Sequence, residues 1–149
     1  MHKTTILIAD DQPDVRAALA LFLSGEGYAV ETAASPAEVL TALEQSGSAA
    51  LILDLNFHTD TTSGREGLAL LKEIRARDAD LPVIVLTGWG NVELAVQAMR
   101  AGANDFLEKP WENARLLSVL RNQVTLANVR AENRHLRAAA TPQPENAII

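Results

Sequence analysis

The fold is decided by residues 51–57, which have the sequence Leu-Ile-Leu-Asp-Leu-Asn-Phe. Leu and Ile fill the first three positions, and such an apolar run is typical of a strand that is buried on both faces of a sheet. The strand ends on the carboxylate of Asp54, and burial of a charge is costly unless the charge has a partner or a task. A strand-end Asp also commonly caps the next turn, so the other strand ends have to decide its role.

The composition is that of one ordinary globular domain. The 149 residues are 48% hydrophobic and 21% charged, which is enough to build a hydrophobic core. The absence of cysteine excludes a disulfide scaffold, a thiolate metal site and cysteine catalysis, and it fits the reducing cytoplasm in which we expect the protein. No apolar run approaches the roughly 18 residues of a membrane span, so we expect no membrane partner.

The net charge of −6 is unevenly distributed. Residues 1–111 contain 8 Lys and Arg against 16 Asp and Glu, whereas residues 112–149 contain 5 Arg against 3 Glu. Nucleic-acid binding requires clustered cations, so the acidic first part is not expected to contact nucleic acid directly. Its acidity favours a metal cation instead.

Strand and helix patterns alternate five times along the chain. The expected strands span residues 4–9, 28–32, 49–54, 83–87 and 104–108. A helical pattern follows each strand, and the second helix begins with the spacing of a capping box, Ser35-Pro36-Ala37-Glu38. The alternation predicts a three-layer α/β fold, in which a parallel sheet is covered by helices on both faces.

Polar side chains stand where four of the strands end. They are Asp10, Asp11, Asp54, Thr87 and Lys109. The carboxyl ends of parallel strands meet at one edge of the sheet, where such folds bind ligands. Each residue has an ordinary explanation when taken alone, but their convergence on one edge predicts a functional site.

The residue types at this edge suit phosphoryl transfer. Three carboxylates in one place repel each other and need a cation, and hard oxygen ligands favour Mg2+ over zinc. Asp54 could attack phosphorus and form an acyl phosphate. The Thr87 hydroxyl could donate a hydrogen bond to a phosphoryl oxygen, and Lys109 could place a positive charge beside another. Such positioning and charge neutralisation are what phosphoryl transfer requires.

This pattern resembles the receiver domain of bacterial two-component response regulators. The five strand-end residues, with Pro110 after Lys109, close the strands of a (βα)5 chain, and the match covers about residues 4–125. The resemblance implies a flavodoxin-like fold with strand order 2-1-3-4-5. It also implies that a sensor histidine kinase phosphorylates Asp54 with Mg2+ present, and that the chain is not an enzyme beyond autocatalytic phosphotransfer and dephosphorylation.

The same resemblance assigns metal ligands. Asp11 would bind Mg2+ directly beside Asp54, and Asp10 would bind through water or assist. The backbone carbonyl of Asn56 would complete the protein ligands.

The resemblance also assigns a readout. Thr87 and Lys109 would contact the phosphoryl group, and Phe106 matches the aromatic switch position of the family. Phe106 fits a core position of the last strand as well, and the two roles are compatible. The Lys109–Pro110 peptide bond is expected to be cis, which is feasible for an X–Pro bond.

The loop after Asp54 departs from the family pattern. The family usually has a Met-Pro turn after its phosphoacceptor and a Gly eight residues on. Here residues 56–64 have no Pro, and the matching Gly-Leu pair is Gly67-Leu68. The longer loop, residues 55–67, is interpreted either as a lid or partner contact beside the site, or as a tolerated surface insertion.

The last helical pattern overruns a domain of this size. Its apolar and Asn positions alternate in steps of three and four, at Val119, Asn122, Leu126, Val129, Asn133 and Leu136. Asn within a heptad seam fixes register and favours two-stranded pairing. We therefore expect an extended C-terminal helix that packs on its own domain over residues 111–121, and that pairs with a second copy over residues 126–140. The alternative is a solvated helix that packs on its own domain.

Residues 141–149 contain Thr-Pro-Gln-Pro-Glu-Asn before an apolar end, which indicates a flexible linker into another domain. The layout resembles the N-terminal third of sigma-54-dependent activators of the nitrogen-regulation type. The resemblance implies an attached ATPase and an attached DNA-binding domain in the full-length protein. The present sequence has no GxxxxGK[ST] motif, so it does not carry that ATPase.

Two other functions compete with this interpretation. Haloacid-dehalogenase-like phosphatases also use an Asp nucleophile and Mg2+, but they require Asp-x-Asp, and position 56 is Asn. A receiver-like interaction domain that is never phosphorylated would not need the complete acidic set. We therefore expect a phosphoacceptor signalling domain that switches the pairing and regulation of an attached transcription activator.

Overall fold

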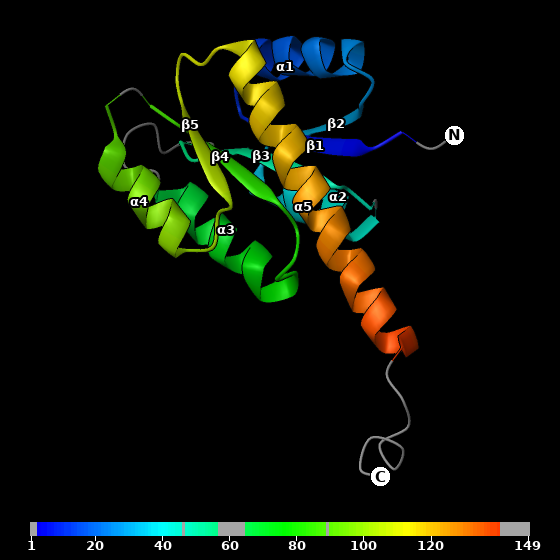
Figure 1. Ribbon diagram of the computed structural model, residues 1–149. Coiled ribbons are helices and arrows are strands. Elements are labelled where there is room, and N and C mark those ends of the chain that lie inside the picture. Colours follow the sequence, from blue (N-terminus) through cyan, green and yellow to red (C-terminus); the bar gives the residue numbers. More distant parts are fainter. Residues whose placement is uncertain (1–2, 46, 57–64, 89, 141–149) are drawn as a thin grey trace.

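The computed structural model describes residues 3–45, 47–56, 65–88 and 90–140. In this part of the chain, five parallel strands form one sheet in the order β2-β1-β3-β4-β5 (Figure 1). The strands are β1 (Thr5–Ala9), β2 (Ala29–Ala33), β3 (Ala50–Asp54), β4 (Val83–Thr87) and β5 (Asp105–Glu108). The helices are α1 (Pro13–Gly25), α2 (Pro36–Gln45), α3 (Arg65–Arg77), α4 (Val92–Arg100) and α5 (Asn113–Ala140). The predicted fold class and strand order are confirmed.

Two hydrophobic clusters fill the two faces of the sheet. Leu51 and Leu53 of β3 belong to the cluster shared with α2, α3 and α4. Ala50 and Ile52 belong to the cluster shared with α1 and α5. All residues of β3 and β4 are buried, as the continuous apolar runs predicted. Each buried Leu or Ile side chain stabilises the fold by about 2 kcal/mol relative to an exposed one.

The strand order creates a switch point beside β1. The chain first places β2 on one side of β1 and then crosses to place β3 on the other side. At such a reversal the connections leave the sheet in opposite directions, and a crevice opens at the carboxyl ends of the two central strands. The sequence places Asp10 and Asp54 at these two ends.

The start of α3 lies close against the end of β3. Gly67, in the first turn of α3, is buried, and a Cβ atom added there would lie 2.2 Å from the backbone oxygen of Leu55. This approach fixes where the chain re-enters the domain after the long loop. Residues 57–64 of that loop lie outside the described residues, so its proposed lid or partner role stays a prediction.

Helix α5 is longer than the sheet that it covers. Leu116, Leu120 and Val124 are buried, and none of the residues 125–136 of α5 is buried. The extended C-terminal helix is therefore confirmed. Val119, which was expected in a pairing seam, is instead buried in the core beside these residues. None of the described helices is long and apolar enough to cross a membrane.

We expect Gly67→Ala to lower the free energy of unfolding by about 2 kcal/mol or more, because the added methyl group would collide with backbone atoms of Leu55. The measurement is urea denaturation followed by circular dichroism. Gly25→Ala is the matched control, since a Cβ there meets nothing within 4 Å. Equal unfolding midpoints for the two variants would show that the contact is unimportant.

Candidate functional site

Sheet register brings Asp10 and Asp54 side by side. Ala9 of β1 pairs with Leu53 of β3, so the next residue of each strand leaves the sheet at the same edge. Asp10 is fully buried and Asp54 is 2% exposed. The hydrophobic packing of two central strands therefore holds two carboxylates together away from solvent.

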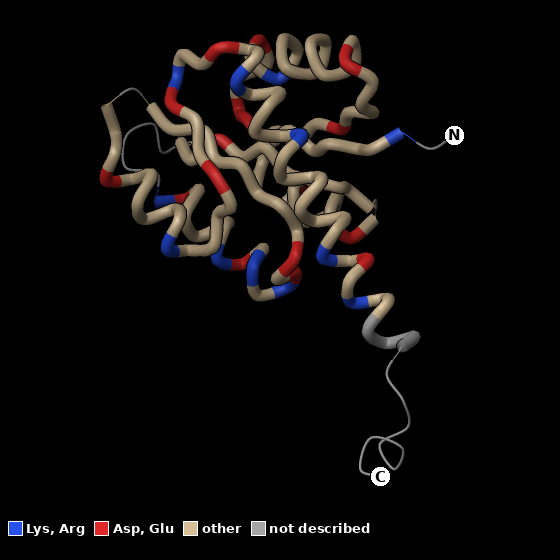
Figure 2. The backbone as a smooth tube through the Cα atoms, viewed as in Figure 1, with Lys and Arg blue, Asp and Glu red and all other residues tan. Residues whose placement is uncertain are grey.

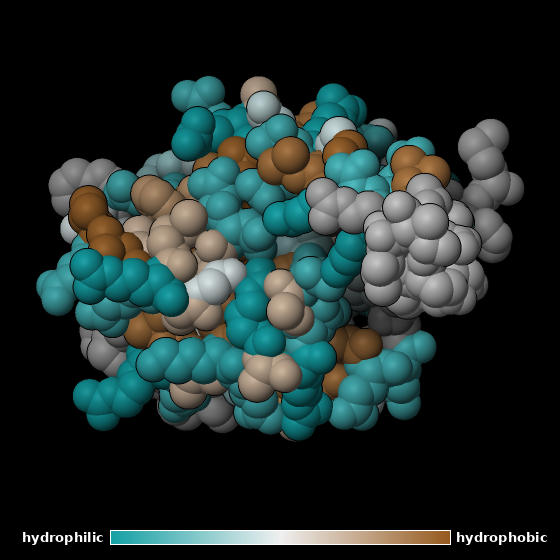
Figure 3. All heavy atoms as spheres, turned by 60° about the horizontal axis from the view of Figure 1, so that its bottom comes forward, coloured by the Kyte–Doolittle hydropathy of each residue, from teal (hydrophilic) through white to brown (hydrophobic). Residues whose placement is uncertain are grey.

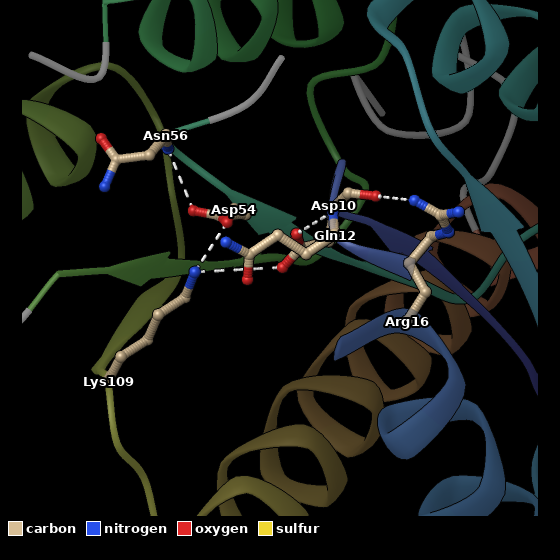
Figure 4. A network of polar contacts seen from close by, with 6 residues as sticks. All are labelled: Asp10, Gln12, Arg16, Asp54, Asn56 and Lys109. Atoms are coloured by element: carbon tan, nitrogen blue, oxygen red, sulfur yellow. Dashed lines mark hydrogen bonds and ion pairs between the residues drawn. The ribbon is translucent and has the colours of Figure 1, made fainter. Parts of the chain in front are cut away.

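A third carboxylate and one amine complete the cluster. Asp10, Asp11 and Asp54 each offer an oxygen atom, and these atoms lie within 4.8 Å of one another. The Lys109 Nζ atom lies 2.7 Å from Asp54 Oδ2 and 3.9 Å from Asp10 Oδ2. Figure 4 shows Lys109 reaching from the end of β5 toward the two buried carboxylates. Its charge offsets part of their mutual repulsion.

The Asp54 carboxylate is held at both oxygens. Oδ1 accepts a hydrogen bond from the backbone N–H of Asn56 at 3.0 Å, and Oδ2 accepts one from Lys109 (Figure 4). The Asn56 contact has the form of an Asx turn, so Asp54 also caps the turn that follows β3, as strand-end Asp residues commonly do. The carboxylate is thus oriented before any ligand arrives.

Thr87 stands at the end of β4, next to Asp54 on β3. Its side chain is fully buried, and its hydroxyl has no hydrogen-bond partner among the described residues. The backbone N–H of Lys109 donates to the Thr87 carbonyl at 2.8 Å, which ties the ends of β4 and β5 together. A buried hydroxyl without a partner is costly, and a bound phosphoryl oxygen would satisfy it.

Burial raises the pKa of the Asp10 carboxyl to about 6, and the negative charge of Asp54 adds to the increase. The backbone N–H of Gln12, which donates to Asp10 Oδ1 at 2.9 Å, and the charge of Lys109 act in the opposite direction. The Asp10 carbonyl also accepts a hydrogen bond from Arg16 at 2.6 Å. Sequence reasoning missed Arg16, because only the tight β1–α1 connection brings its guanidinium back to β1.

The donor set fits a hard divalent cation. Its atoms are carboxylate oxygens, and Asp10 Oδ2 is buried with no hydrogen-bond partner among the described residues. Oxygen ligands with room for water are what Mg2+ prefers, whereas zinc prefers nitrogen and sulfur.

The remaining expected site residues lie on or just after β5. Phe106 is half-buried and packs against the cluster under α2, α3 and α4. The Lys109–Pro110 peptide bond is cis. Sequence reasoning passed over Glu108, whose carboxylate accepts a hydrogen bond from the backbone N–H of Gly90 in the β4–α4 connection.

The family model of the response regulator receiver domain matches residues 6–121. The chain belongs to this family. Receiver domains are phosphoacceptor signalling modules of two-component systems and bind Mg2+ through an acidic pocket, so the family resemblance read from the sequence is confirmed. The phosphatase alternative is not favoured by this match.

Among the relatives, the chain is 38% identical over 143 residues to the C4-dicarboxylate transport transcriptional regulatory protein DctD of Pseudomonas aeruginosa, covering 96% of this chain and 30% of that protein. It is 34% identical to the nitrogen assimilation regulatory protein NtrX of Azorhizobium caulinodans, covering 92% of this chain and 30% of that protein. The chain thus spans about a third of the length of these curated relatives.

Solved structures agree with this placement. NtrX from Brucella abortus in complex with ADP matches with a TM-score of 0.84 and 34% identity, covering 95% of this chain and 31% of that one. The receiver domain of the same NtrX matches with a TM-score of 0.74 and 38% identity, covering 80% of this chain and 98% of that one. The receiver domain described here is therefore similar to one that is attached to further domains in its relatives.

We expect the affinity for Mg2+ to fall as the pH drops through about 6, approaching a tenfold loss per pH unit below that value. The reason is that Asp10 holds a proton below its raised pKa of about 6, and a cation in the acidic pocket must displace it. Calorimetric titration with Mg2+ between pH 7.5 and pH 5, values chosen to bracket that pKa, measures the change. Asp10→Asn, which cannot titrate, should bind more weakly but with little pH dependence in this range. An equal pH dependence in both proteins would contradict the assignment to Asp10.

Proposed function

We propose that this receiver domain takes a phosphoryl group on Asp54 from a sensor histidine kinase in the cytoplasm, with Mg2+ as the cofactor. The observation that carries the proposal is the state of the Asp54 carboxylate. It is buried, oriented by Asn56, ion-paired with Lys109 and adjacent to two further carboxylates. Asp10 at the end of β1 has similar contacts, but its ion pair with Lys109 is longer, at 3.9 Å, and its pKa is raised to about 6.

The transfer follows from the positions of the side chains. One Asp54 oxygen forms a bond to phosphorus while the bond between phosphorus and the kinase histidine breaks, and the imidazole nitrogen keeps the electron pair. Lys109 can exchange its contact with Asp54 Oδ2 for a phosphoryl oxygen, and the free Thr87 hydroxyl can donate to another. The chain is the substrate of the kinase and turns over no separate substrate.

The metal would be held by the acidic pocket. Asp11, Asp54 and the backbone carbonyl of Asn56 are the proposed protein ligands, and Asp10 assists from its buried position. The bound Mg2+ supplies positive charge that neutralises the phosphoryl oxygens.

The readout is proposed to run through β4 and β5. A phosphoryl group on Asp54 would draw the Thr87 hydroxyl toward β3 and free space on the same face of the sheet. Phe106 packs on that face and is only half-buried, so its ring can rotate into the space. Two such packings of the same residues form a two-state element that a few new hydrogen bonds can bias.

Helix α5 is proposed to carry the signal to a second copy of the chain. Residues 1–125 would act as the receiver and residues 126–140 as a helical linker. Leu126, Val129 and Leu136 are 45%, 48% and 53% exposed, and Asn133 is also exposed. At about 3.6 residues per turn these four positions share one side of α5. This side borders the buried face, because Leu126 lies seven residues after the buried Val119. Val119, which is buried in the core, does not contribute.

An ion pair joins the second half of α5 to the domain and so helps to set the orientation of the helix. Arg134 NH1 lies 2.5 Å from Asp80 Oδ2 in the connection between α3 and β4, on the side of α5 that faces the domain. Figure 2 shows charged residues along this part of α5 as it extends past the sheet. The end of the molecule toward which α5 extends is mostly hydrophilic, with scattered hydrophobic side chains (Figure 3). The exposed apolar positions of α5 itself are therefore the proposed contact with a second copy.

The attached output is proposed to be a sigma-54-dependent transcription activator with an ATPase and a DNA-binding domain. The support is that the chain covers about 30% of transcription regulators of the DctD and NtrX type, and that residues 141–149 have the composition of a linker. This domain would contact neither nucleic acid nor membrane. Its partners would be the kinase, a second copy and the attached domains.

We expect Asp54→Ala to abolish phosphate incorporation from acetyl phosphate and Mg2+, as measured by intact mass, because among the described carboxylates it is Asp54 that ends β3 and contacts Lys109 at 2.7 Å. Asp14→Ala is the matched control, since Asp14 is an exposed carboxylate at the start of α1. A single phosphate adduct of normal yield on Asp54→Ala would refute the assignment.

We expect beryllofluoride with Mg2+, which mimics a phosphoryl group on Asp, to change the dimer fraction of the unaltered chain in light scattering. Crosslinking through a cysteine placed at position 126 should change with it. Leu126→Glu should lower the dimer fraction, because it puts like charges into the seam. Leu21→Glu alters an equally large exposed leucine on α1 and should not. If neither the dimer fraction nor the crosslinking responds, residues 126–140 are only a tether.

A further inference from the structure

Glu108 and Thr87 face the same side of the sheet. The register of β4 and β5 pairs Val85 with Phe106 and Thr87 with Glu108. Val85 belongs to the cluster under α2, α3 and α4, and Phe106 packs against it. Side chains two residues apart on a strand point to the same face. Glu108 therefore stands beside Thr87 and one step beyond Phe106, at the edge of the sheet that carries the acidic pocket.

The Glu108 carboxylate is bonded to the β4–α4 connection. Its Oε2 atom accepts a hydrogen bond from the backbone N–H of Gly90 at 3.1 Å. Gly90 has a φ of +77°, a conformation that residues with a Cβ rarely adopt. It lies three residues after Thr87, so the bond ties the segment that follows Thr87 to the end of β5.

The strand order determines which movement of Thr87 this hydrogen bond opposes. β4 lies between β3 and β5, so Thr87 stands between Asp54 on one side and Glu108 on the other. Any movement of Thr87 toward a phosphoryl group on Asp54 is a movement away from β5. The bond from Gly90 to Glu108 opposes that movement, because Gly90 belongs to the same short segment of chain.

We propose that Glu108 is a positioning residue that holds the β4–α4 connection in its unphosphorylated arrangement, and so sets how readily the receiver switches. The proposal rests on the proposed function of Asp54 and Thr87. A hydrogen bond that exists in one of the two arrangements and is lost in the other shifts the equilibrium between them by the net free energy of that bond. For a hydrogen bond to an exposed charged acceptor, this shift is about threefold to tenfold.

The test compares three variants of the full chain with the unaltered protein. Glu108→Ala removes the acceptor, whereas Glu108→Gln keeps an acceptor oxygen without the charge. Glu112→Ala removes an exposed carboxylate four residues on, for which no contact with the connection is seen in the described residues. Each protein is titrated with beryllofluoride at saturating Mg2+, and the amide signals of Thr87 and Gly90 are followed by nuclear magnetic resonance. Amide hydrogen exchange of Gly90 is measured without ligand.

We expect Glu108→Ala to reach half conversion at about threefold to tenfold lower beryllofluoride concentration, with faster Gly90 exchange without ligand. Glu108→Gln should stay close to the unaltered protein, and Glu112→Ala should match it. An unchanged or higher midpoint for Glu108→Ala would overturn the proposal. A shift in Glu108→Gln or in Glu112→Ala as large as that of Glu108→Ala would also overturn it, since charge would then be the cause.

The outcome also distinguishes this proposal from the one on which it rests. If the unaltered chain gives no response to beryllofluoride, the proposed phosphoacceptor function fails and the restraint by Glu108 fails with it. If the unaltered chain responds and Glu108→Ala responds at the same concentration, only the restraint fails.

Discussion

The confinement of two carboxylates at one buried edge is the constraint on which the rest of the site depends. Asp10 and Asp54 are brought together by the pairing of β1 with β3, and both side chains are buried. Lys109 contacts both, so it carries much of the compensation for their charge. The compensation is incomplete, because the pKa of Asp10 stays raised and one of its oxygens has no hydrogen-bond partner among the described residues. An acidic site left in this condition attracts a cation.

The sequence predicts what depends on local periodicity and on strand ends. Burial of β3 and β4 follows from their apolar runs. The expected capping box forms in part: the Glu38 backbone N–H donates to Ser35 Oγ at 3.2 Å, and Glu38 Oε1 accepts from the backbone N–H of Ala34 at 3.2 Å. The strand-end residues could be listed because parallel strands present their carboxyl ends together. Contacts that depend on how a connection folds back could not be predicted. Arg16 on the Asp10 carbonyl and Glu108 on Gly90 are of this kind.

The two edges of the sheet differ in how firmly they are tied. At the edge away from the acidic pocket, Arg75 of α3 donates to the Gly102 carbonyl at 2.7 Å and to Asn104 Oδ1 at 2.6 Å. The same Asn104 oxygen accepts from the backbone N–H of Val83 at 2.8 Å. Helix α3 and the starts of β4 and β5 are thereby joined through one side chain. At the pocket edge, the Lys109 backbone N–H donates to the Thr87 carbonyl at 2.8 Å, and the Gly90 backbone N–H donates to the Glu108 carboxylate at 3.1 Å.

Helix α5 is one continuous helix of 28 residues, and only its first half is packed on the sheet. The 16 residues after Val124 extend about 24 Å beyond the last buried position. A rigid rod of that length acts as a lever arm. A tilt of about 10° at the sheet would carry the far end sideways by about 4 Å, roughly three quarters of the rise of one helical turn. A change in side-chain packing that is too small to alter the fold can thus shift the segments that follow α5 in two paired copies relative to each other.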